Sequence, residues 1–255
     1  MKNLKKLLAL TLAVLFVFSL TACVKDSDKT TVSEGKLTMA TNATFPPYEY
    51  IEGNKVVGID AEIAALIAKK LDLELEIKDT EFDSIIPGVQ KNKYDIGMAG
   101  MTVTDERKQQ VSFSSSYAKG VQVVIVTEDS KIKTTDDLKG KKIGVQQSTT
   151  GDIYASDDFG EDNVTRYGNG NMAVEALKAG KVDCVIIDNE PAKAYVAANK
   201  GLKILDTSYA EEEYAICINK NNKDLQKKID KALKELIDDG SVQKIIDKYI
   251  SADAE

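Results

Sequence analysis

The sequence predicts an α/β fold made of two similar units, each a parallel sheet covered by helices on both faces. The main observation is that strand-like and helix-like segments alternate, with short joints, from Leu37 to Asp206. The alternation runs through two successive series of about 85 to 90 residues each, which predicts two α/β units side by side. A second observation is that two apolar strand-like stretches, 116–129 and 208–220, flank the second series. Each could be an extended strand that crosses from one unit to the other.

The first series begins with a strand at 37–41 and continues with a helix at 58–71. In this helix the apolar residues Ile59, Ile63, Leu66 and Ile67 follow the spacing i, i+4, i+7, i+8, and Asp60 is the expected cap. A strand at 73–77 alternates apolar and polar residues. A short helix at 82–93 and a strand at 94–101 complete the series.

The second series begins after Ser130 with a short helix at 134–140, for which Thr135 is the expected cap. The remaining elements alternate in order: strand 141–145, polar loop 146–150, helix 151–159, strand 163–168, helix 171–180, strand 182–188, helix 190–199 and strand 202–206.

The C-terminal part is predicted to be helical. An apolar stripe defines a helix that Gly240 ends, and a shorter helix follows it. The stripe consists of Leu225, Ile229, Leu233, Leu236 and Ile237, and the shorter helix carries Val242, Ile245, Ile246 and Tyr249.

The two crossing strands make the first unit discontinuous. We expect a first lobe at 36–116 and 215–255, a second lobe at 122–209, and hinge strands at 117–121 and 210–214. This arrangement predicts a cleft between two lobes that a two-strand hinge connects.

The N-terminus has the features of an export signal. Three lysines precede an almost unbroken apolar run, Leu7–Leu20, which is shorter than the roughly 20 residues that a membrane span needs. The run ends in L-T-A-C, which resembles the bacterial lipobox, so we expect residues 1–22 to be a lipoprotein signal peptide and Cys23 to be lipidated. An uncleaved anchor is the alternative. Residues 23–35 are polar and aperiodic, and we expect them to be a flexible tether.

Composition excludes several classes of function. The chain of 255 residues has no histidine and no tryptophan, so a histidine-based metal site and a Ser-His-Asp triad are both excluded. The formal charge is −7, and an acidic chain without a basic patch argues against nucleic acid as a partner. Cys184 and Cys217 lie in apolar runs and are expected to be buried free thiols, although a disulfide between them is an alternative in an exported protein.

Candidate site residues follow the predicted strands, because parallel sheets of this kind bind ligands at the carboxyl ends of their strands. They are Asn42, Phe45 and Glu49 after the first strand, Glu81 and Phe82 before the second helix, Gly100, Met101, Thr102 and Arg107 after the third strand, and Gln146, Ser148, Thr149, Thr150 and Asp188 in the second series.

These residue types are complementary to a zwitterionic amino acid. Arg107 can bind a carboxylate bidentately, a charge-assisted contact worth roughly 1.5–3 kcal/mol. Backbone N–H groups at Thr102 and at the helix start near 149–150 add donors for the same anion. Asp188 offers the opposite charge for an α-ammonium, and the two phenylalanines can enclose the side chain.

Five motifs then carry a family resemblance that covers the chain from about Leu37 to Tyr249. They are NATFPPYEY (42–50), VGIDAEIAALIAKKL (57–71), FDSIIPGVQKNKYDIGMAGMTVTDERKQQVSFSSSY (82–117), LKGKKIGVQQSTTG (138–151) and VDCVIIDNEPA (182–192). The chain resembles the extracellular solute-binding proteins of polar amino-acid ABC importers, which have the type II periplasmic-binding fold. The combined block G-x-T-x-T-x-E-R, at 100–107, is the most specific part.

The resemblance implies roles for individual residues. Phe45 and Phe82 match the family's stacking aromatics, Gly100 and Thr102 its ammonium and carboxylate contacts, with Met101 between them, and Arg107 its carboxylate clamp. Ser148, Thr149 and Thr150 fall on the carboxylate-binding loop of the second lobe, and Asp188 on the ammonium-binding aspartate. Many relatives have an acid where this chain has Asn42.

Each role has a plain structural alternative. Arg107 could be a surface arginine at a helix start, Asp188 a helix N-cap, the two phenylalanines core residues, and the 148–150 loop simple turn chemistry.

The resemblance also implies a monomer without cofactor or metal, tethered to the extracellular face of the cell membrane through Cys23. It would capture an L-amino acid and deliver it to the permease subunits of an ABC transporter without catalysing a reaction. Candidate specificity residues are Asn42, Glu49, Glu81 and Gln146, and an excess of carboxylates favours arginine or lysine over glutamine or cystine. An enzyme resembling cyclohexadienyl dehydratase, with Glu81 or Glu190 as its acid, and an amino-acid sensor are the rival functions.

Overall fold

The computed structural model describes residues 30–206 and 208–250. The predicted signal peptide, Cys23 and the first part of the predicted tether lie outside these residues. Residues 30–35, the end of the predicted tether, are among the described residues. There the backbone N–H of Val32 donates to Asp95 Oδ1 at 2.6 Å, just before the first strand. None of the helices formed by the described residues has the length and apolarity needed to cross a bilayer.

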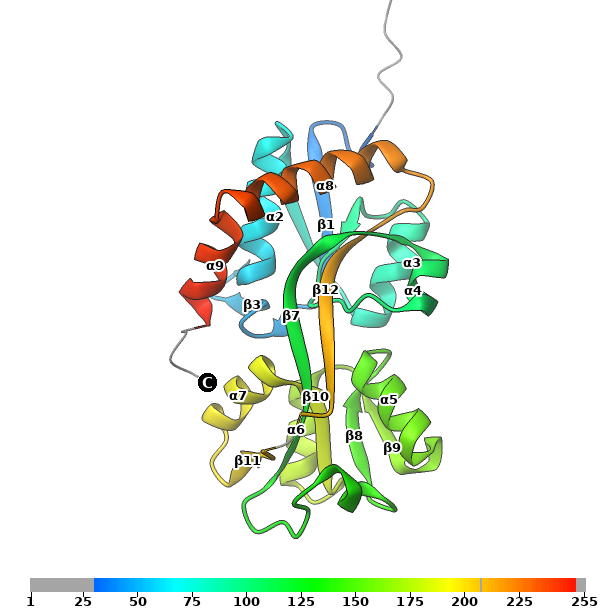
Figure 1. The fold of residues 1–255 in the computed structure, drawn as a ribbon, viewed down its shortest axis with the longest axis vertical. Helices are drawn as coiled ribbons and strands as arrows, with labels where there is room; N and C mark the ends of the chain where they lie inside the picture. Colours follow the sequence, from blue (N-terminus) through cyan, green and yellow to red (C-terminus); the bar gives the residue numbers. More distant parts are fainter. Residues whose placement is uncertain (1–29, 207, 251–255) are drawn as a thin grey trace, which may run out of the picture. The chain divides into compact units, whose positions relative to one another are not determined.

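The main sheet has nine strands, and two of them are long enough to belong to both halves of the sheet (Figure 1). The strand order is β5 (Glu74–Asp79), β1 (Lys36–Thr41), β6 (Ile96–Gly97), β12 (Ala210–Ile218), β7 (Ser112–Thr127), β10 (Cys184–Asp188), β8 (Ile143–Gln146) and β9 (Val164–Tyr167), with β11 (Leu202–Ile204) paired to β7. Strands β1, β5 and β6 are parallel, as are β8, β9 and β10, whereas β7 and β12 are antiparallel to each other. A small second sheet contains β2 (Thr44–Phe45), β3 (Glu49–Glu52) and β4 (Lys55–Val57).

Helices cover each half of the sheet and define two lobes. The first lobe has α2 (Ile59–Lys70), η1 (Phe82–Ser84), α3 (Ile85–Gln90), α4 (Asp105–Gln110), α8 (Lys223–Asp238) and α9 (Ser241–Tyr249). The second lobe has η2 (Thr135–Leu138), α5 (Thr150–Phe159), η3 (Glu161–Asn163), α6 (Gly170–Lys178) and α7 (Asn189–Ala198). The predicted α/β architecture of two lobes joined by two strands is therefore present, and β7 and β12 are the strands that join them (Figure 1).

The long helix α8 packs its apolar stripe onto the first lobe. Leu225, Ile229, Leu233 and Leu236 are buried, as their helical spacing predicts. Ile237 is the exception, because it is 40% exposed and lies beside the stripe. Gly240 follows the helix with φ of 77°, a left-handed conformation that ends a helix at low energetic cost in glycine.

Three predicted details are wrong in an informative way. Asp60 does not cap α2, since Gly58 holds the N-cap position, and Thr134 rather than Thr135 caps η2 together with Asp137. The strand predicted at 94–101 is paired only at Ile96–Gly97. Beyond Gly97, the backbone N–H of Gly100 donates to Asp60 Oδ2 at 2.9 Å and not to a neighbouring strand.

Both described cysteines are buried and unpaired. Cys184 lies in β10 of the second lobe and Cys217 in the part of β12 that pairs with β6 of the first lobe. Burial raises the pKa of both thiols to about 12, so they behave as small apolar core residues.

Candidate functional site

A cavity lies between the two lobes, at the carboxyl ends of their parallel strands, as expected for open α/β sheets. About 300 Å³ of space free of protein atoms, part of it open to solvent, lies between its walls. The residues that line it are Asn42, Phe45, Glu49, Phe82, Ala99, Gly100, Thr102 and Arg107 from the first lobe, and Gln146, Thr149, Thr150 and Asp188 from the second.

Arg107 projects from the first turn of α4 and is only 5% exposed. Its Nη1 donates to the backbone oxygen of Thr102 at 2.7 Å, and its Nη2 donates to that of Ser148 at 3.0 Å. The guanidinium carbon lies 5.3 Å from the centre of the Phe82 ring, a cation–π contact. These two carbonyl groups use two of the five guanidinium N–H donors, so the remaining donors can bind an anion in the cavity.

The start of α5 provides further donors on the opposite wall. Thr149 caps the helix, and its Oγ1 accepts from the backbone N–H of Asp152. The preceding residue, Ser148, has φ of 62° and donates its backbone N–H to Asp152 Oδ2 at 2.9 Å. Arg166 in turn donates to the Asp152 carboxylate at 2.8 Å, which fixes this loop. A helix N-terminus held in this way favours an anion in front of it.

Asp188 ends β10 and occupies the N-cap position of α7, but its side chain makes no capping hydrogen bond. Its Oδ2 instead accepts from Gln122 Nε2 at 2.7 Å, and its Oδ1 accepts from the hydroxyl of Tyr214. Burial, followed by the charge of Glu212, raises the pKa of Asp188. The side chain therefore serves the cavity rather than the helix.

Glu49 lies in the same cavity and is almost completely buried. Asp60, which accepts from the backbone N–H of Gly100 and from the hydroxyl of Tyr117 at 2.9 Å each, acts on Glu49 through its charge. Burial first, and the charge of Asp60 second, raise the pKa of Glu49 well above its ordinary value. Because burial and mutual repulsion disfavour two negative charges here, one proton shared by the two carboxyl groups would be stabilised.

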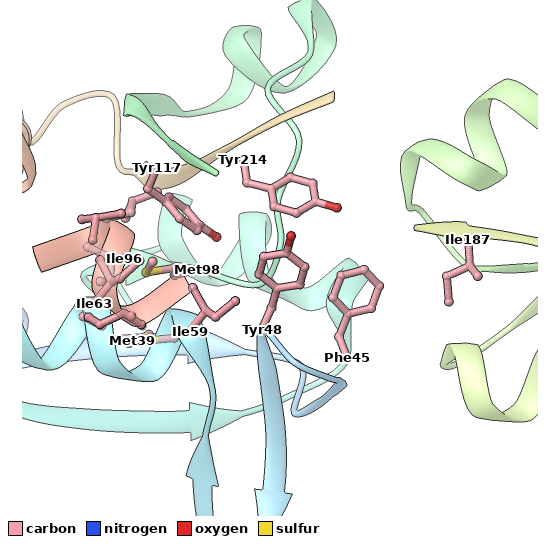
Figure 2. Close-up of a cluster of buried hydrophobic side chains, with 14 of the residues drawn as sticks. Met39, Phe45, Tyr48, Ile59, Ile63, Ile96, Met98, Tyr117, Ile187 and Tyr214 are labelled. Carbon is pink, nitrogen blue, oxygen red and sulfur yellow. The ribbon is translucent and has the colours of Figure 1, made fainter. Parts of the chain in front are cut away.

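An aromatic cluster supports this side of the cavity (Figure 2). The rings of Tyr48 and Tyr214 meet edge to face with centroids 5.1 Å apart, and Phe45 lies beside Tyr48 at 6.0 Å. Gly100 packs directly against Phe45, since a Cβ built on Gly100 would come within 2.7 Å of the Phe45 ring. With φ of 52° as well, this position strongly favours glycine.

Hydrogen bonds join the lobes around the cavity. Besides the contact of Arg107 with the Ser148 carbonyl, further bonds cross from one lobe to the other. They include Gln146 Nε2 to Asn42 Oδ1 at 3.0 Å, Gln147 Nε2 to Asp83 Oδ2 at 3.1 Å and the Tyr195 hydroxyl to the Thr44 carbonyl at 2.5 Å. These hydrogen bonds hold the two lobes against each other around the cavity.

Three residues predicted for the site do not line the cavity. Met101 is fully buried in a core cluster with Ile85 and Val111. Ser148 takes part through its backbone, which positions Arg107. Glu81 lies outside the lining, toward Gly168 of the second lobe.

Residues in the strands that join the lobes were not predicted from the sequence. Gln122 on β7 and Glu212 on β12 are buried and bonded to each other at 3.1 Å, and Glu212 also accepts from Thr102 Oγ1 at 2.9 Å. The alternation of side chains along a strand could have indicated that Glu212 is buried, because Glu212 shares a face with Tyr214 while Glu211 is exposed on the opposite face.

Comparison with known proteins identifies the family. The model of the bacterial extracellular solute-binding proteins, family 3, matches residues 37–252. The chain is 33% identical over 255 residues to the arginine-binding extracellular protein ArtP of Bacillus subtilis, covering 98% of this chain and 100% of that protein.

Two solved structures have the same fold. One is the arginine-, lysine-, histidine-binding protein ArtJ of Geobacillus stearothermophilus, with a TM-score of 0.81 and 36% identity over 84% of this chain and 95% of that chain. The other is an ancestral arginine-binding protein bound to glutamine, with a TM-score of 0.81 and 41% identity over 86% of this chain and 99% of that chain. The fold is thus the two-lobed periplasmic-binding fold, and the chain belongs to the bacterial extracellular solute-binding proteins, family 3.

Proposed function

We propose that this protein captures a basic L-amino acid, such as arginine or lysine, and delivers it to the permease of an ABC importer. The charge pattern of the cavity carries the proposal. One guanidinium, Arg107, and two carboxyl groups, Glu49 and Asp188, line a small enclosed space. A molecule with one carboxylate and two cationic groups matches this pattern, because each of its charges then has a buried partner of opposite sign.

Each end of the ligand has an assigned partner. The α-carboxylate would bind the free donors of Arg107 and the N-terminus of α5, and the α-ammonium would bind Asp188. The side-chain cation would bind Glu49 and release the proton that Glu49 shares with Asp60. Phe45 and Phe82 would cover the aliphatic part of the ligand and exclude water.

Binding would close the lobes without any chemical reaction. The contacts of Arg107 and Asn42 with the second lobe, at Ser148 and Gln146, support closure around the ligand. The segments 117–121 and 210–214, which pair between Glu211–Tyr214 and Ala118–Val121, would absorb the rotation. We further propose that the mature protein is a monomer anchored through a lipid on Cys23 at the outer face of the membrane.

Glutamine is the second candidate ligand, and one observation favours it. The side-chain amides of Asn42 and Gln146 bond to each other at 3.0 Å and line the cavity, and such a pair can also bind a carboxamide. Cystine is a further possibility that the screen below includes.

A thermal-shift screen of the purified protein against the twenty amino acids, ornithine and cystine tests the proposal. We expect arginine, lysine or ornithine to give the largest increase in melting temperature. The variant Glu49→Gln should lose affinity for these cations by tenfold or more, because one charge-assisted contact contributes roughly 1.5–3 kcal/mol. The control Glu52→Gln alters an exposed residue of the same strand and should bind as the wild type does. A glutamine-only response would refute the basic ligand.

The enzyme alternative has one supporting observation, a buried acid in the cavity whose burial raises its pKa, as acid catalysis requires. That acid is Glu49, whereas Glu190 is paired with Lys193 at 2.8 Å and Glu81 lies outside the cavity lining. Because the charges that line the cavity match a zwitterionic amino acid, we expect the purified protein to leave prephenate unchanged. Turnover of prephenate would replace transport by catalysis.

A further inference from the structure

Asp188 and Glu212 form a buried pair of carboxyl groups between the cavity and the joining strands. Gln122 Nε2 donates to both, at 2.7 Å to Asp188 Oδ2 and at 3.1 Å to Glu212 Oε2. The two carboxyl groups are therefore neighbours that accept from the same amide nitrogen. Asp188 lines the cavity, whereas Glu212 lines a hollow on the joining strands that includes the exposed Lys119.

One oxygen of this pair has no hydrogen-bond donor among the described residues. Glu212 Oε2 accepts from Thr102 and Gln122, but the buried Oε1 has no partner. A buried polar atom left without a partner costs roughly 1–3 kcal/mol, and two ionised carboxylates in contact repel each other. A single proton held between Asp188 and Glu212 removes both penalties.

One cation faces the pair. Arg107 acts on both Glu212 and Asp188, but its hydrogen bonds go to the carbonyl groups of Thr102 and Ser148 and to neither carboxyl group. The other groups that face the pair are uncharged or acidic. They are Tyr48 and Glu49 from the β3 region, Gln122 from β7, Thr150 and Tyr154 from α5, and Tyr214 from β12.

We propose that the Asp188–Glu212 pair holds one proton while the cavity is empty, and that the α-ammonium of a bound amino acid displaces this proton to water. The inference rests on the proposed amino-acid binding. The O–H···O bond between the carboxyl groups opens, the proton leaves through Glu212 to the hollow, and N–H···O bonds form from the ammonium to Asp188. The pair changes from one negative charge to two, and the ammonium offsets the added charge.

Binding is therefore linked to pH, with Glu212 as the positioning residue that makes the linkage. The ligand-free pair binds one proton more than the liganded pair, so affinity falls as the pH falls. Within the linked range the Kd rises by up to about tenfold for each pH unit. An acidic environment would favour release of the amino acid.

Calorimetry with L-arginine in phosphate and in Tris at pH 7 measures the protons released, because the ionisation enthalpies of the two buffers differ. We expect the wild type to release about one proton more than Glu212→Gln, because the carboxamide of that variant cannot share a proton with Asp188 in this way. The control Glu213→Gln alters the exposed neighbour and should match the wild type. Equal proton release by the wild type and Glu212→Gln would overturn the proposal.

The pair Glu49–Asp60 can release a proton of its own, so Glu49→Gln serves as a second reference. Glu49→Gln should lower the total number of protons released. In the Glu49→Gln background, adding Glu212→Gln should still reduce the release by about one proton. A ligand-free measurement separates this inference from the proposed function. In carboxyl ¹³C NMR, Asp188 should titrate well above the ordinary range in the wild type and lower in Glu212→Gln. Titration of Asp188 near pH 4 in the ligand-free wild type would refute the shared proton even if no amino acid binds.

Discussion

Replacing Arg107 by lysine tests the carboxylate contact while it preserves the positive charge. Lysine cannot reproduce the planar fork that reaches the carbonyl groups of Thr102 and Ser148 and still presents two donors to a carboxylate. We therefore expect the loss of one charge-assisted hydrogen bond to the ligand, worth roughly 1.5–3 kcal/mol. The Kd for the cognate amino acid should rise by roughly 10- to 150-fold.

Titration calorimetry measures this change, and circular dichroism establishes that the variant is folded. Lys108 follows Arg107 on the same helix and is exposed, so Lys108→Gln is the matched control. Lys108 pairs with Asp105 and does not line the cavity, so the Kd of this variant should stay within about twofold of the wild type. A Kd for Arg107→Lys within the same limit would refute the assigned role of the guanidinium.

Three further predictions address closure, packing and pH. Tyr195→Phe removes the hydrogen bond to the Thr44 carbonyl, so calorimetry should show an affinity loss of about 1 kcal/mol; no loss would exclude this contact from closure. Leu233→Ala should lower the free energy of unfolding by about 2–5 kcal/mol, whereas Ile237→Ala, at a partly exposed position, should change it far less; equal effects in urea unfolding would contradict the packing of α8. Burial raises the pKa of Asp60 to about 6 in the folded protein. Between about pH 4 and 6 the folded state therefore still binds a proton that the unfolded state has released. The free energy of unfolding should therefore fall by up to about 3 kcal/mol across that window as the pH rises, and Asp60→Asn should lack this slope; equal pH slopes would contradict it.

Sequence patterns predicted most of the architecture, because the helices show one apolar face to a core and the central strands are short apolar runs buried on both faces. The apolar stripe of α8 predicted which face of that helix is buried, and the alternation of strands and helices on either side of β7 predicted the two units. Details that depend on a tertiary contact were not predictable in this way. Asp60 follows the helix-cap pattern, yet its carboxylate binds Gly100 and Tyr117, from segments that lie far along the chain.

The candidate site was only partly accessible from the sequence, for a related reason. Residues that follow strands, such as Arg107 and Asp188, were found because the ends of parallel strands meet at one edge of each sheet. Gln122 and Glu212 lie within the long joining strands, where an acid in the run Glu211–Glu213 looks like a solvated surface residue. Only the pairing of β7 with β12 brings them together beside Asp188.

A crystal structure of the protein with L-arginine is the most direct test of the proposed recognition. We expect the α-carboxylate on Arg107, the α-ammonium on Asp188 and the guanidinium of the ligand on Glu49, all inside the closed cavity. A ligand bound elsewhere, or one whose charged groups contact none of these three side chains, would contradict this assignment.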